Sequence, residues 1–78
     1  MARFFFHLHN DEFVEDGEGR ELTDPAMARV CAVREAREVM SALVKEGRLN
    51  LSHKIEVVDA EGRVVCAVRF GDAVVVQP

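Results

Sequence analysis

The first apolar segment of the chain, residues 3–10, carries hydrophobic side chains at consecutive positions and not only at alternate ones. Successive side chains of a β-strand point to opposite faces of the sheet. The two faces of such a strand would hold different sets, Phe4, Phe6 and Leu8 on one and Phe5, His7 and His9 on the other. Because a single helix covers only one face of a sheet, the second face needs a partner, a ligand or solvent.

One long helix is predicted from Pro25 to about residue 46. Asp24 can accept hydrogen bonds from the free amides of the first turn, and Pro25 suits the first helical position. Gly47 is typical of the residue that follows a helix. The apolar residues in this range recur at helical spacing and form one stripe: Ala32, Val33, Ala36, Val39, Met40, Leu43 and Val44.

A β-hairpin is predicted from residues 54–59 and 63–70. Its register depends on whether the loop has three residues or four. The shorter loop would place Val65 and Ala67 beside Ile55 and Val57, whereas the longer loop would place Val64, Cys66, Val68 and Phe70 there. A one-residue slip moves every side chain to the other face. The four-residue loop, with Gly62 at positive φ, is preferred because it gathers the large residues on one side.

The remaining strands are short. A second strand is predicted either at residues 12–15 or around 20–22, and a final edge strand at residues 73–76, ended by Pro78. The chain therefore forms a single α+β domain, residues 1–78, in the order β-(β)-α-β-β-β. A mainly antiparallel sheet of four to five strands carries one long helix packed on one face.

The predicted core is small for a chain of 78 residues. The strand residues expected to meet the helix stripe are Phe4, Phe6, Leu8, Ile55, Val57, Val64, Cys66, Val68 and Phe70. Burying one such side chain contributes about 1.5–3 kcal/mol. Domains of this size are only marginally stabilised by their own core, so an additional buried interface would stabilise the fold.

The net charge of −4 is unevenly distributed. Residues 11–24 hold seven acidic residues and one basic residue, whereas the rest of the chain has a net charge of +2. Overall acidity argues against nucleic acid as a partner, although a local basic surface is compatible with it. On the predicted helix, Arg34 and Glu38 are spaced as an ion pair.

No segment has the length of apolar sequence that spans a membrane, and no secretory signal is recognisable. Cys31 and Cys66 are isolated from each other and fall inside a helical and a strand pattern, as small buried hydrophobic residues do. The sequence therefore predicts a cytoplasmic protein. Neither cysteine is paired with an evident base, and no glycine-rich phosphate loop is present, so the sequence predicts no enzyme and no cofactor.

A metal site is one hypothesis for the first strand. His7, His9 and Asp11 lie at positions i, i+2 and i+4 and could present two imidazoles and a carboxylate, a ligand set that suits Zn²⁺. Histidines at alternate positions are also common on solvated strand faces, so the sequence signal is weak.

The sheet face that the helix leaves open is the stronger candidate for a functional surface. Its predicted residues are Arg3, Phe5, His7, His9, Lys54, Glu56, Val58, Arg63, Val65, Ala67 and Arg69. Contact with an unknown protein partner, or a homodimer built on this face or on an edge strand, would use Phe5, His7, His9, Val58, Val65 and Ala67. Single-stranded nucleic acid would instead use Arg3, Phe5, Lys54, Arg63 and Arg69. Because only one aromatic ring is available for stacking, protein contact is favoured.

The chain also resembles a family of short uncharacterised bacterial proteins classed as a domain of unknown function. The resemblance lies in the opening R-F-F-F strand at residues 3–6, the D-x-x-G-x-E-L-x-D segment at residues 16–24, the helix, and the hairpin with a D-x-x-G turn at residues 57–70. It covers nearly the whole chain. The resemblance implies the α+β fold and brings no activity, cofactor or catalytic residue.

Overall fold

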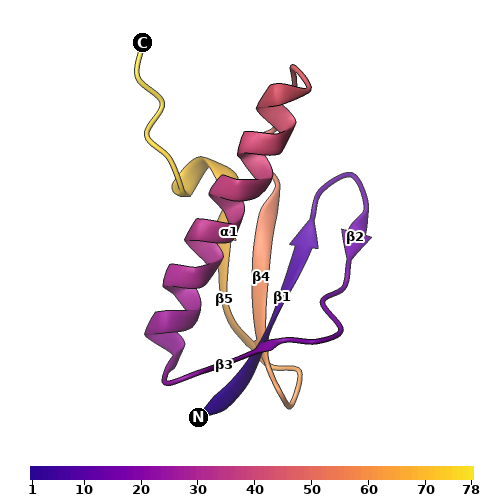
Figure 1. Ribbon diagram of the computed structural model, residues 1–78, viewed down its shortest axis with the longest axis vertical. Helices are drawn as coiled ribbons and strands as arrows, with labels where there is room; N and C mark the ends of the chain where they lie inside the picture. Colours follow the sequence, from indigo (N-terminus) through magenta and orange to yellow (C-terminus); the bar gives the residue numbers. More distant parts are fainter.

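The computed structural model describes all residues from 1 to 78 and consists of a five-stranded antiparallel sheet with one long helix across one face (Figure 1). The elements are β1 (Ala2–His9), β2 (Phe13–Val14), β3 (Arg20–Leu22), α1 (Pro25–Lys45), β4 (Lys54–Asp59), β5 (Val64–Arg69) and the 3₁₀ turn η1 (Phe70–Asp72). The sheet order is β2-β1-β4-β5, and β3 also pairs with β1. The predicted α+β architecture is confirmed.

Both candidate positions for the second strand are occupied. β2 pairs with the end of β1, through Leu8 and Val14, and β3 pairs with its start, through Phe4 and Arg20. The acidic segment therefore runs back along one edge of β1, with residues 15–19 as a loop between the two short strands.

The local signals of the helix act as predicted. The Asp24 side chain accepts a hydrogen bond from the Met27 amide at 2.9 Å, and Pro25 takes the first position. At the other end Gly47 adopts a φ of 82°. The amide of Arg48 then reaches back to the Leu43 carbonyl, which is the usual closure of a helix that ends with glycine.

The helix packs closely on the sheet because its inner face is made of small residues. Ala28, Ala32 and Ala36 have no exposed surface, and Met40 is 5% exposed. The buried strand residues opposite them are Phe4, Phe6, Ile55, Val57 and Val68. Val44, predicted to lie on the same stripe, is 57% exposed because the last turn of α1 extends past the end of the sheet (Figure 1).

The hairpin contains both of the predicted registers, separated by a β-bulge. Next to the turn, Val58 pairs with Val64, as a three-residue loop requires, and Gly62 has the expected positive φ. Further along, Val57 pairs with Cys66, which is the register of a four-residue loop. The inserted residue, Val65, is half-buried and packs against the core. Val64 is 61% exposed, so its predicted place in the core is wrong.

The predicted final strand at residues 73–76 does not form. The chain turns at η1, where the Ala73 amide donates to the Phe70 carbonyl, and then leads away from the sheet (Figure 1). The carbonyl of Ala73 accepts a hydrogen bond of 2.7 Å from Arg37 of the helix instead of a strand partner. Val75 and Val76 are 84% and 69% exposed. The fifth strand of the sheet is therefore β3, and β5 is left as an edge.

The close packing of α1 on the sheet requires small residues on the inner face of the helix, and this requirement can be tested. Ala32→Leu should lower the free energy of unfolding by about 1–3 kcal/mol, because a larger side chain has to push α1 away from the sheet. Ala42→Leu, at an exposed position of the same helix, is the matched control and should change stability by less than about 0.5 kcal/mol. Urea unfolding followed by circular dichroism measures both. Equal midpoints for the two variants would contradict close packing at Ala32.

Candidate functional site: the open sheet face

The open face of the sheet, opposite α1, is organised in three cross-strand rows. Pairing across β1, β4 and β5 aligns Phe5, Val58 and Val64 in one apolar row. The middle row is His7, Glu56 and Ala67, and the outer row is His9, Lys54 and Arg69. The predicted face is therefore present, with Val64 added to it and Val65 drawn toward the core.

Asp16 attaches the acidic segment to the middle of β1. Its carboxylate accepts the Phe6 amide at 3.1 Å and also accepts the amides of Glu18 and Gly19, each at 3.1 Å. Its own amide donates to Nδ1 of His7 at 3.0 Å. The carboxylate thus takes the position of a strand partner between β2 and β3. The sequence analysis missed this role. An Asp at the start of a glycine-containing turn is nevertheless a local signal, because its carboxylate can accept the amides two and three residues later.

The electrostatics of Asp16 follow from these contacts. Burial raises the pKa of Asp16, but hydrogen bonds from the amides of Phe6, Gly19 and Glu18, together with the nearby His7 ring, lower it. The net pKa lies below the ordinary value of 3.8. Asp16 is therefore ionised throughout the neutral range, as a carboxylate that accepts several amides should be.

Gly19 allows the acidic segment to lie directly against β1. Its φ is 72°, and a Cβ at this position would lie 2.8 Å from the Phe4 carbonyl oxygen and 3.0 Å from a ring carbon of Phe5. The chain approaches so closely that any side chain here would collide with backbone. One side of Phe5 is thereby covered by the protein itself.

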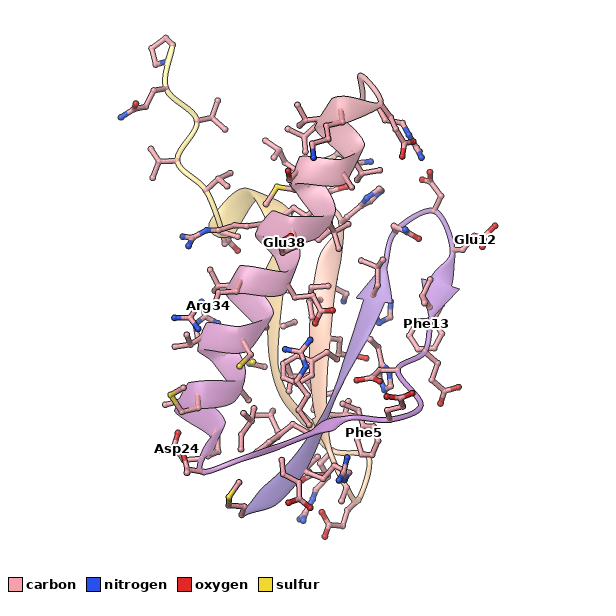
Figure 2. All side chains as sticks on the ribbon, in the orientation of Figure 1. Phe5, Glu12, Phe13, Asp24, Arg34 and Glu38 are labelled. Atoms are coloured by element: carbon pink, nitrogen blue, oxygen red, sulfur yellow. The ribbon has the colours of Figure 1, made fainter.

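The histidines of β1 are covered in part by Phe13 of β2. The ring centroid of Phe13 lies 4.7 Å from that of His9 and 5.5 Å from that of His7. Nε2 of His9 is also 3.2 Å from Oε1 of Glu56 on the neighbouring strand. Figure 2 shows Phe13 on the short strand that flanks β1. Both imidazole rings, for which the sequence offered no partner, therefore pack against side chains of the same chain.

The three predicted metal ligands do not converge. Asp11 lies in the turn after β1, and its Oδ1 is 3.6 Å from Nε2 of His53. His7 instead accepts a hydrogen bond from the Asp16 amide. His9 contacts Glu56 and Phe13. No group of three histidine, cysteine, aspartate or glutamate side chains is arranged to hold a metal ion.

The basic residues predicted for nucleic acid are partly neutralised. Arg3 lies 3.4 Å from Glu21, and Arg63 lies 3.3 Å from Asp59. Lys54 and Arg69 form no ion pair and stand together in the outer row. The two remaining bases are separated from Phe5 by the middle row of the face.

A hollow of about 290 Å³ lies between the acidic segment and the hairpin turn. Phe5 and Val58 belong to its lining together with His7, Glu15, Asp16, Gly17, Asp59, Ala60 and Gly62. The exposed Val64 side chain stands in the same cross-strand row as these two apolar residues. The open face thus combines a hollow whose apolar lining comes from Phe5, Val58 and Ala60 with an exposed apolar side chain beside it.

A family described as a domain of unknown function (DUF6894) matches residues 3–71. The chain belongs to this family. No curated protein and no solved structure is significantly similar to it. The family match includes every strand of the sheet except Ala2 of β1, all of α1 and the first two residues of η1, and it ends before the exposed valines of the last residues. The helix α1 lacks the long apolar stretch required to cross a bilayer.

The role of Asp16 predicts a pH-dependent stability. Because the pKa of Asp16 is lower in the folded chain than in the unfolded one, its contribution is complete above the ordinary value of 3.8 and is lost as the pH falls through the folded value. At pH 7, Asp16→Asn should lower the free energy of unfolding by about 1–3 kcal/mol, because three amides lose a charged acceptor. Near pH 3 the variant and the parent chain should differ less.

The measurement is urea unfolding followed by circular dichroism at several pH values, since the chain has no Trp or Tyr. Glu15→Gln is the matched control, because Glu15 is exposed and makes no hydrogen bond or ion pair. A difference between Asp16→Asn and the parent that stays constant from pH 7 to pH 3 would refute this account.

Proposed function

We propose that the protein is a cytoplasmic, non-enzymatic interaction module that forms a homodimer through its open sheet face. The observation that carries the proposal is the apolar row of Phe5, Val58 and Val64. It combines a hollow, which Phe5 and Val58 help to line, with a valine that is 61% exposed. In a two-fold contact each copy offers the same surface to the other, so Val64 of each copy can fill the hollow of its partner.

The energetics of the small core support this proposal. Only 11 of 78 residues are buried, and three of those on the helix are alanines. The free energy gained by burying such a core exceeds the conformational entropy lost on folding by only a small amount. Covering the apolar row on dimerisation would remove further apolar surface from water at about 25 cal/mol per Å².

The polar surroundings of the row suit a protein partner. Ion pairs flank it, with Arg63 beside Asp59 and Arg3 beside Glu21. Polar side chains around an apolar patch are typical of protein interfaces. Nucleic acid stacked on Phe5 would meet Arg3 and Arg63, which are already paired with carboxylates.

Cysteine chemistry gives no support to an enzyme. Burial raises the pKa of the Cys66 thiol, while the neighbouring Arg29 opposes that rise. A raised pKa disfavours the thiolate that a nucleophile requires. Cys31 and Cys66 are both free and half-buried, as expected of packing residues in a reducing compartment.

The dimer is tested by charging the exposed member of the row. Sedimentation velocity or light scattering over a range of concentrations should show the parent chain passing from monomer to dimer. Val64→Glu should shift this equilibrium toward monomer by about tenfold or more, because the new carboxylate would be desolvated beside the carboxylates of Glu15, Asp16 and Asp59 that line the hollow. Val44→Glu, at a similarly exposed valine of α1, is the control and should dimerise as the parent does. A parent chain that stays monomeric at millimolar concentration would exclude the dimer.

A further inference from the structure

Strand β5 is an unpaired edge of the sheet. It stands last in the strand order, and the valines that follow η1 do not pair with it. Its residues 64–68 carry no charge, although charged residues at edge strands normally prevent other chains from pairing there. A stretch of this kind invites an additional strand.

The free backbone groups of this edge can be assigned. The Phe70 amide donates to the His53 carbonyl at 2.7 Å, and Val68 pairs with Ile55 two residues further along. Along an antiparallel strand, the N–H and C=O groups of successive residues point alternately toward the partner strand and away from it. The backbone groups of Val68 therefore point to β4, whereas those of Ala67 and Arg69 point outward, where an added strand would bind.

A groove of about 400 Å³ runs along the flank of α1 on the side of this edge. Its lining consists of three apolar residues and three arginines: Ala26, Val30 and Val33, and Arg29, Arg34 and Arg37. Arg37 donates a hydrogen bond to the Ala73 carbonyl. Arg29 lies close enough to the Cys66 thiol of β5 to lower its pKa. These contacts locate the groove beside β5. In Figure 2, Arg34 points outward from the flank of α1 on the side away from β2.

The charge of the groove is uncompensated. None of the three arginines forms an ion pair with a carboxylate, and the predicted pair of Arg34 with Glu38 is absent. A second β5 edge in a two-fold arrangement would bring a second set of arginines against the first, which is repulsive. The occupant should therefore be negatively charged and should not be the same edge of another copy.

We propose that β5 and the arginine groove together bind an extended acidic peptide of another protein, which adds as a strand to the sheet. The backbone of the peptide pairs with the outward groups of Ala67 and Arg69, as in other cases of strand addition. Its β-branched side chains contact Val30 and Val33, and its carboxylates meet the arginines. The groove has no aromatic ring on which a nucleobase could stack, so RNA fits this surface less well. The inference does not depend on the dimer, because the open face and the β5 edge are different surfaces.

The probe is a fluorescein-labelled peptide of seven residues, Glu-Thr-Val-Thr-Val-Thr-Glu, titrated with the full-length chain and followed by fluorescence anisotropy. Because alternate side chains of a strand share one face, its two valines and two glutamates all point toward the groove. Saturable binding that weakens as salt is raised from about 50 to 300 mM is expected. Arg34→Glu should weaken binding by about tenfold. Lys45→Glu makes the same charge change at an exposed position at the end of α1, outside the groove, and should leave the affinity within about twofold.

Amide hydrogen exchange distinguishes strand addition from simple charge attraction. With the peptide bound, the amides of Ala67 and Arg69 should exchange at least about tenfold more slowly, whereas that of Val68, already bonded to β4, should change little. Binding without protection of Ala67 would overturn the strand-addition proposal. Equal binding of a peptide with lysine in place of glutamate, which requires no protein variant, would also overturn it, as would displacement of the peptide by single-stranded RNA at equal concentration.

Discussion

The central constraint on this fold is that one helix covers a sheet whose middle strand is apolar on both faces. β1 lies between β4 and the short strands β2 and β3, with Phe4 and Phe6 facing α1 and Phe5 on the other side. Three alanines on α1 let the helix approach closely enough to exclude water from the first face. Nothing of comparable size covers the second face, and the unusual features of the protein follow from this difference.

The acidic segment partly compensates for the missing layer. Asp16 holds it to β1 through the Phe6 amide, Gly19 permits its close approach, and Phe13 covers the two histidines. Apart from Asp16, its acidic residues are exposed to water, where the mutual repulsion of their carboxylates is screened. The segment covers the β1 side of the open face and leaves the β5 side uncovered, so the apolar row ends in the exposed Val64.

The two proposed binding surfaces have different chemistry because they arise differently. The open face carries its apolar row at the end next to the hairpin turn, with ion pairs on either side, which suits a second copy of the same surface. The β5 edge combines unpaired backbone groups with arginines that lack carboxylate partners, which suits an acidic strand. Both surfaces depend on the bulge and the turn at the ends of β5. The bulge brings Val64 to the open face, and η1 directs the following valines away from the edge.

The sequence alone determined the features that depend on neighbouring residues. Asp24 and Pro25 begin the helix, Gly47 ends it, and Gly62 shapes the hairpin, because each acts on backbone within a few positions. Alternation along β1 also identified which aromatic rings enter the core. Only the tertiary structure decided which distant groups meet. The amide of Phe6 reaches a carboxylate ten residues away, and Asp11 contacts His53 instead of the nearer histidines. The bulge at Val65 and the loss of the final strand were decided in the same way, since the packing of β5 against β4 and α1 overrode the strand preference of the valines.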